Sequence, residues 1–278
     1  MKHLMQQVYY ARLNRMQICS AYKDIRNQTL KKFFYRVLYP LARPFYLISL
    51  ILNTIIACLV AIIISQLERK GNLAHYVGKF WSLLNIFLSG TRLTIKGKEK
   101  INKNLTYIVM SNHQSLFDVW ALIGKIPLQL RWVVKSEIRK MPIFGYTLER
   151  IGHVYIDRKN RKGTSNSLEA ASRKIKEGTS VIIFPEGTRS EDGHLLKFRM
   201  GGAIIALKSG IPILPVTVNG SRFVLPKNTL ALMPGKIEIV VGDVIDPSGY
   251  DENHKYELME KIRSAIEKNL DLEYGKLT

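Results

Sequence analysis

The chain of 278 residues is long enough for one substantial α/β domain with an accessory segment. Hydrophobic residues make up 46 % of it, a proportion that is typical of globular proteins and excludes a wholly disordered chain. Lysine and arginine number 42 against 22 aspartates and glutamates, and the formal net charge of +20 indicates an anionic partner, either nucleic acid or an acidic lipid surface.

The N-terminal part is first basic and then strongly apolar. Residues 1–44 carry nine Lys/Arg and a single acid, Asp24, so we expect a basic segment that lies against acidic lipid. Residues 45–65 contain no charged residue and are long enough to cross a hydrocarbon core of about 30 Å. The alternatives are a buried core helix, which is seldom uncharged for so long, and a signal peptide, which should begin nearer to residue 1. The two cysteines, Cys19 and Cys58, are too few for a disulfide framework and favour a reducing compartment.

A second apolar stretch, residues 80–89, is too short to span a membrane. The basic flank predicts a cytoplasmic N-terminus, and a single crossing would place the remainder outside. The remainder is itself basic, which suits the acidic cytoplasmic leaflet. We therefore predict a membrane-embedded two-helix motif over residues 45–90 that enters and leaves on one side, with its turn at residues 71–78. This places the protein on the cytoplasmic face of the inner (cell) membrane. No zinc-finger, recognition-helix or RNA-binding signature supports nucleic acid as a partner.

From residue 91 onward, short β-branched runs alternate with helical stretches. The expected strands are residues 106–111, 130–135, 153–157, 180–184, 213–218 and 236–242. The expected helices are residues 116–124, 164–178 and 201–210. This alternation predicts an α/β domain over residues 91–278, with a mixed, largely parallel sheet flanked by helices. Ligands should gather at the carboxyl ends of the strands.

The stretch SNHQSLFD (111–118) follows the first of these strands. On one continuous helix, His113 and Asp118 would be rotated by about 140° and could not pair. They can meet if a helix begins between them, and the Ser115-x-x-Asp118 capping pattern predicts such a start with Ser115 as the cap. The carboxylate could then hold the imidazole as a base that removes a proton from a hydroxyl. Helix capping by Asp118 and a turn histidine at 113 remain the alternatives, and no other histidine or cysteine stands at metal-binding spacing.

A second motif, SVIIFPEGTRS (180–190), reads as a buried strand that ends in a polar turn. Gly187 permits close approach of the backbone to a ligand, and Arg189 offers a planar fork for phosphate or carboxylate. Lys197 and Arg199 precede a glycine-started helix, whose N-terminus favours anions. Together with Lys135 at the end of another strand, these residues predict an anion pocket, whereas each alone could be an ordinary solvated side chain.

Taken together, these segments resemble the glycerolipid acyltransferase family of the lysophosphatidic acid acyltransferase type. Four blocks stand in the family's order: NHQSLFD (112–118), IGHVYIDR (151–158), FPEGTRS (184–190) and ILPVTVNG (213–220). The stretch VVKSEIRKMPIFG (133–145) is similar to the segment that separates the first two blocks.

The resemblance implies transfer of a fatty acyl group from acyl-CoA or acyl-ACP (the acyl carrier protein thioester) to the sn-2 hydroxyl of 1-acylglycerol 3-phosphate, giving phosphatidic acid. By the same resemblance, His113 is the general base and Asp118 orients it. The implied phosphate-binding set is Arg189, Lys135, Glu186, Gly187, Thr188 and Arg158. No metal or prosthetic group is implied, and the family is associated with an N-terminal pair of membrane helices.

Two alternatives remain open at this point. A member of the same family could act on another acceptor, such as glycerol 3-phosphate or a different lysophospholipid. A non-catalytic membrane protein could instead use its basic excess to bind anionic lipid.

Overall fold

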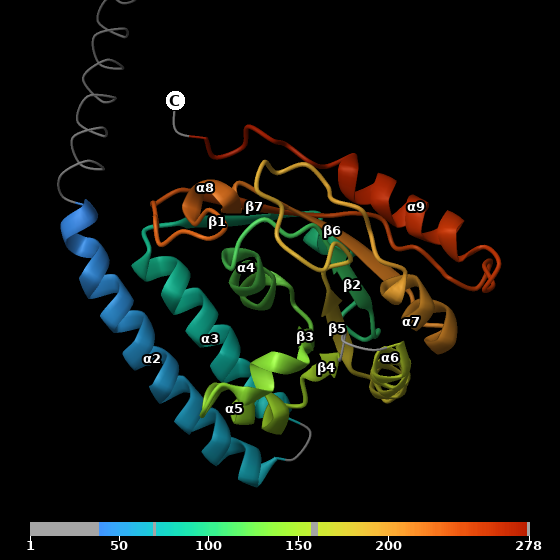
Figure 1. Cartoon of the computed structure of the whole chain (residues 1–278), viewed down its shortest axis with the longest axis horizontal. Helices are drawn as coiled ribbons and strands as arrows, with labels where there is room; N and C mark the ends of the chain where they lie inside the picture. The colour runs from blue at the N-terminus through green and yellow to red at the C-terminus, as the bar shows by residue number, and fades with distance from the viewer. Residues whose placement is uncertain (1–38, 69–70, 157–160, 277–278) are drawn as a thin grey trace, which may run out of the picture. The chain divides into compact units, whose positions relative to one another are not determined.

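The computed structural model describes residues 39–68, 71–156 and 161–276 (Figure 1). The chain forms two compact units, Met1–Ile48 and Ser49–Thr278. Of the first unit, only the helical residues 39–48 are described. Most of the basic segment predicted over residues 1–44 therefore lies outside the described residues, as does Cys19. Cys58 is a free, buried cysteine.

The predicted pair of helices is present as α2 (Tyr39–Leu67) and α3 (Asn72–Leu88). By length and composition, α2 could cross a membrane over Leu41–Leu67. The predicted turn is wrong in its extent, because α3 already begins at Asn72 and Gly78 lies within it.

Side-chain hydrogen bonds join these two helices. Asn53 Nδ2 donates to Asn85 Oδ1 at 3.0 Å, and Trp81 Nε1 donates to Thr54 Oγ1 at 3.0 Å. Polar groups in an apolar interface are stabilising when they are paired in this way.

The sheet has seven strands in the order β1-β7-β6-β2-β5-β3-β4. Their bounds are β1 Arg92–Lys96, β2 Ile108–Ser111, β3 Leu130–Lys135, β4 Val154–Ile156, β5 Ser180–Ile183, β6 Ile213–Asn219 and β7 Lys236–Val241. All neighbouring strands are parallel except β6 and β7. The predicted mixed, largely parallel sheet is therefore confirmed, and the carboxyl ends of β2, β3, β4, β5 and β6 lie at one edge.

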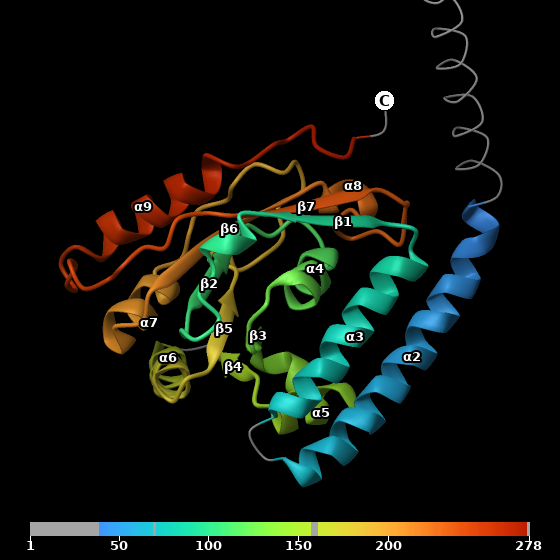
Figure 2. The same cartoon turned by 180° about the vertical axis from the view of Figure 1, so that it is seen from behind.

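Helices cover both faces of the sheet (Figure 2). The bounds are α4 Phe117–Lys125, α5 Phe144–Ile151, α6 Arg161–Lys176, α7 Gly201–Ser209, α8 Ser221–Val224 and α9 Lys255–Glu267, with 3-10 turns η2 Lys98–Lys100 and η3 Ser136–Lys140. The main core packs α6, α7 and α9 against β2, β5 and β6. On the other face α3 packs against α4. Strands buried on both faces read as continuous apolar runs, which is why β2 and β5 were visible in the sequence.

Candidate active site

The loop between β2 and α4 brings two of the predicted residues together. Helix α4 begins at Phe117, between His113 and Asp118, as their spacing requires. Because Leu116 is the residue that precedes the helix, the prediction that Ser115 is its cap is wrong. Ser115 nevertheless supports the turn: its Oγ accepts from the N–H of Phe117 at 3.3 Å, and its own N–H donates to Asp118 Oδ2 at 2.8 Å.

The side chains of His113 and Asp118 are in contact, with 2.8 Å between Nδ1 and Oδ2. The carboxyl group is fully buried, whereas 15 % of the His113 side chain is exposed. The same Oδ2 also accepts the N–H of Gln114 at 2.6 Å. A carboxylate can only accept, so the neutral imidazole donates through Nδ1, and Nε2 is left as the acceptor. This is the tautomer that a general base needs.

Phe184, which follows β5, stacks on the His113 ring. The two ring centroids lie 4.0 Å apart and the planes differ by 16°. The stacked phenyl ring and the bond to Asp118 together restrict both torsions of the imidazole side chain. The sequence reasoning did not single out Phe184, although it precedes the Pro-Glu-Gly motif directly.

Glu186 holds the backbone of this loop. Its Oε1 accepts the N–H of His113 at 2.7 Å, and its Oε2 accepts the N–H of Leu196 at 3.0 Å. Burial raises the pKa of Glu186, and these two backbone donors oppose the effect. Glu186 is only 3 % exposed, and both of its carboxylate oxygens accept backbone N–H groups.

Asn112 and Gln114, which flank the histidine, were missed by the sequence reasoning and are also fixed. Asn112 Nδ2 donates to the carbonyl of Val218 at 2.9 Å, and Asn112 Oδ1 accepts the N–H of the same residue at 2.8 Å. Gln114 Nε2 donates to the carbonyl of Gly193 at 3.2 Å. Every residue from 112 to 115 is therefore bonded to a neighbouring element or to Asp118.

The turn after β5 carries the predicted anion-binding residues. Gly187 has φ +72°, a conformation that favours glycine. Thr188 is exposed and Arg189 is partly exposed. The backbone of Arg189 lies close to His113 because the next residue, Ser190, donates its N–H to the carbonyl of His113 at 2.8 Å. Within the described residues, Arg189 forms no salt bridge.

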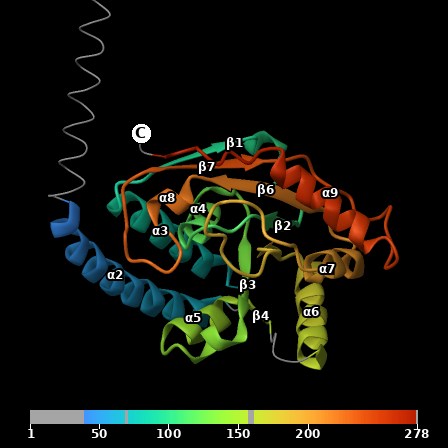
Figure 3. The same cartoon turned by 45° about the horizontal axis from the view of Figure 1, so that its top comes forward.

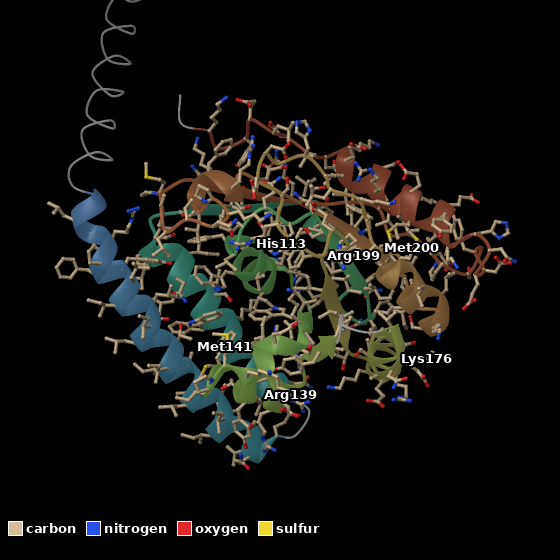
Figure 4. The ribbon with its side chains drawn as sticks, viewed as in Figure 1. His113, Arg139, Met141, Lys176, Arg199 and Met200 are labelled. Atoms are coloured by element: carbon tan, nitrogen blue, oxygen red, sulfur yellow. The ribbon has the colours of Figure 1, made fainter. Side chains whose placement is uncertain are left out.

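Three further cations belong to the same edge of the sheet. Lys135 ends β3, two strands from β2, which is about 10 Å at the usual strand spacing. Lys197 and Arg199 precede α7, and the N–H of Arg199 donates to the carbonyl of Pro185 at 2.8 Å. Figure 4 shows Arg199 on the approach to α7, with His113 nearer to α4. All three are exposed and form no salt bridge in the part of the chain that the structure describes. Arg158 lies outside the described residues.

The remaining histidines are differently placed. His153 is buried, and its Nδ1 accepts the N–H of Trp132 at 2.7 Å, so it acts as a structural acceptor. Among residues 39–68, 71–156 and 161–276, no three His, Cys, Asp or Glu side chains are grouped so that they could hold a metal ion.

Comparison with known proteins gives consistent matches. The Acyltransferase family model matches residues 92–219. A 1-acyl-sn-glycerol-3-phosphate acyltransferase of Pseudomonas aeruginosa is 30 % identical over 201 residues, which cover 70 % of this chain and 77 % of that protein. The protein of the same name from Cocos nucifera is 34 % identical over 199 residues, covering 70 % of this chain and 63 % of the relative. The chain spans less than two thirds of the length of several relatives of this name.

The fold has a counterpart among solved structures. The crystal structure of the 1-acyl-sn-glycerophosphate (LPA) acyltransferase PlsC from Thermotoga maritima matches with a TM-score of 0.65 and 27 % identity. The match covers 89 % of this chain and 95 % of the other. With the ordered motifs, the fold and the relative from Pseudomonas aeruginosa in agreement, the chain belongs to the 1-acyl-sn-glycerol-3-phosphate acyltransferase family.

Proposed function

We propose that this protein transfers a fatty acyl group from a thioester, acyl-CoA or acyl-ACP, to the sn-2 hydroxyl of 1-acylglycerol 3-phosphate. The observation that carries the proposal is the 2.8 Å contact between His113 and Asp118. It lies at an edge of the sheet where Arg189, Lys135, Lys197 and Arg199 form no salt bridge with any residue that the structure describes. The names of the relatives support the acceptor, since a 1-acyl-sn-glycerol 3-phosphate is what those enzymes are named for.

The proposed mechanism uses side chains alone. His113 Nε2 removes the proton of the acceptor hydroxyl as its oxygen attacks the thioester carbonyl carbon. Asp118, which receives the Nδ1 proton, stabilises the imidazolium formed in this step. When the tetrahedral intermediate collapses, the carbon–sulfur bond breaks, the thiolate takes the proton from His113, and the new ester is released. General-base assistance of this kind typically contributes about 10²–10⁴-fold.

The cations position the acceptor in this scheme. Arg189 binds the phosphate of the lysolipid, with Lys135 as a second contact, and places the hydroxyl near Nε2. A guanidinium matches two phosphate oxygens at once, which fixes orientation as well as distance. Lys197 and Arg199 add positive charge along the route by which an anionic headgroup or donor approaches.

Membrane association supports the choice of an amphiphilic acceptor. The described part of α2 exposes large apolar side chains, among them Ile51, Ile56 and Ile63. From Ser49 onward the same helix packs on α3 and α5, where Cys58 and Ala61 are buried. We propose that α2 and α3 lie in one leaflet at the cytoplasmic face, with the net positive charge directed to anionic lipid.

The test is an acyltransferase assay of the purified chain in detergent, with acyl-CoA and acyl-ACP as donors. The acceptors are 1-acylglycerol 3-phosphate, glycerol 3-phosphate and a lysophospholipid without a free phosphate monoester. We expect turnover with the first acceptor and a loss of two or more orders of magnitude in His113→Ala, as general-base catalysis predicts. Turnover only with another acceptor would overturn the substrate assignment, and an unaffected His113→Ala would overturn the mechanism.

A further inference from the structure

The connection between η3 and α5 contains an unusual backbone conformation. Ile143 has φ +60° and ψ −58°, and the N–H of Phe144 donates to the carbonyl of Pro142 at 2.6 Å, which closes a γ-turn. A β-branched residue is a conformational outlier at positive φ, and glycine would adopt this turn with less strain. The sequence therefore retains an isoleucine at a position where the backbone alone favours another residue.

The turn is held rigidly. The N–H of Gly145 donates to the carbonyl of Met141 at 2.9 Å, and Thr147 Oγ1 donates to the carbonyl of Ile143 at 2.8 Å. A Cβ atom at Gly145 would lie 2.5 Å from the carbonyl oxygen of Arg139, so the start of α5 is in close contact with η3. The side chains on the turn are thus presented in fixed directions.

These side chains are apolar and face outward. Met141, Ile143 and Tyr146, here named the apolar turn, are 51 %, 45 % and 51 % exposed. Two exposed cations, Arg139 and Lys140, precede them directly. Arg139 pairs with Glu149, whereas Lys140 forms no salt bridge among the described residues. An apolar tip with a tyrosine and a flanking lysine is the composition of segments that enter the interface of a bilayer.

The helix that follows the apolar turn packs beside α2. Phe144 and Thr147, the neighbours of Ile143 and Tyr146, line one cavity together with Ala57 and Cys58 of α2. Figures 1 and 3 both show α5 beside the second half of α2. On that half the outward side chains Ile55, Ile56, Leu59, Val60 and Ile63 are all exposed. A lipid phase that covers α2 would therefore also reach the apolar turn.

We propose that the apolar turn is a second membrane contact, which inserts Met141, Ile143 and Tyr146 into the interface of an anionic bilayer. It belongs to the α/β part of the chain, and η3 links it directly to Lys135 at the end of β3. Insertion of the turn therefore sets the height of the cationic edge above the lipid. The inference rests on the proposed function, since its consequence is the delivery of a lysolipid phosphate to that edge.

The first experiment measures insertion directly. Tyr146→Cys, in a Cys19→Ser/Cys58→Ala background, is labelled with an environment-sensitive fluorophore and bound to phosphatidylcholine/phosphatidylglycerol vesicles that contain spin-labelled lipid. The matched control carries the label at Glu260→Cys, an exposed position on α9, across the sheet from α3. We expect quenching at 146 and none at 260. Equal quenching at both positions in bound protein would overturn the proposal.

The second experiment separates insertion from a structural role, using Met141→Ser/Ile143→Gly. Glycine relieves the strain at 143, so we expect a Tm in detergent that is equal to or above that of the wild type. Turnover of acceptor embedded in vesicles should fall about tenfold because two apolar anchors are lost, while turnover in detergent should not change. A lower Tm with equal loss in both media would show the residues to be structural. A wild-type protein without turnover in detergent would refute the proposed function, and the quenching result would still decide the membrane contact.

Discussion

The side-chain amide of Asn112 makes the hydrogen bonds to β6 that the backbone of one more β2 residue would make, and replacing Asn112 by alanine removes them. Strand β2 ends at Ser111, which is in register with Val216 of β6. The next backbone groups of β6 on this side, the N–H and C=O of Val218, are instead paired by the Asn112 amide at 2.8 and 2.9 Å. Val218 is fully buried and Asn112 is 1 % exposed, so water does not readily replace the amide.

The size of the effect follows from these two bonds. Each buried backbone group left unpaired costs about 1–3 kcal/mol, so the loss of both partners should lower the free energy of unfolding by about 2–6 kcal/mol. This is a large part of the roughly 5–15 kcal/mol that stabilises a typical domain. Because Asn112 is bonded to β6 and adjacent to His113, the change should also loosen the base and lower kcat by tenfold or more at temperatures where the variant is folded.

Denaturant unfolding in detergent measures the stability, and a steady-state assay below the transition measures kcat. Asn219→Ala is the matched control, since Asn219 is equally buried and its amide also makes two hydrogen bonds to backbone groups, of Asn269 and Asp271. The control should lose comparable stability and keep kcat. If Asn112→Ala unfolds like the wild type, or if both variants lose kcat equally, the inferred link between strand pairing and the position of the base is wrong.

Three further predictions concern the site and the buried His153. Asp118→Asn keeps an oxygen acceptor but removes the charge, so kcat should fall about 10²–10⁴-fold with little change in KM, and an unchanged kcat would contradict the proposed pair. Arg189→Ala should raise KM for the phosphate-bearing acceptor by tenfold or more, whereas Arg173→Ala, on the exposed side of α6, should leave it unchanged; equal values would remove the phosphate assignment. Burial lowers the pKa of His153 well below its ordinary value, so at low pH the unfolded chain binds more protons than the folded chain and stability is lost as the pH falls below about 6.5. Melting curves between pH 7.5 and 5 should show this slope, His153→Gln should flatten it, and a constant Tm would contradict the reasoning.

Some elements were missed although the sequence contained their signal. Helix α9 buries Leu258, Met259, Ile262 and Ile266, a spacing of three and four residues that is typical of an amphipathic helix. Helix α5 was harder to predict because it has only 8 residues and follows the γ-turn at Ile143. Strand β1 was missed because it lies at the edge of the sheet, begins and ends with charged residues and depends on its partner β7.

The sequence alone determined the features that depend on neighbouring residues. The apolar run of α2, the alternation of strands and helices, and a helix start between His113 and Asp118 all follow from local composition and periodicity. The positions of both motifs after buried strands also placed them at one edge of a parallel sheet.

Which distant groups meet depends on how the chain folds in three dimensions. Glu186 accepts the N–H of His113 across 73 residues, and Asn112 pairs with Val218 across 106 residues. Hydropathy and periodicity record whether a side chain is buried, but they do not record which backbone group it faces once strands from different parts of the chain are adjacent. That is why the sequence predicted that His113 and Asp118 meet, while the residues that hold them in place emerged only from the fold.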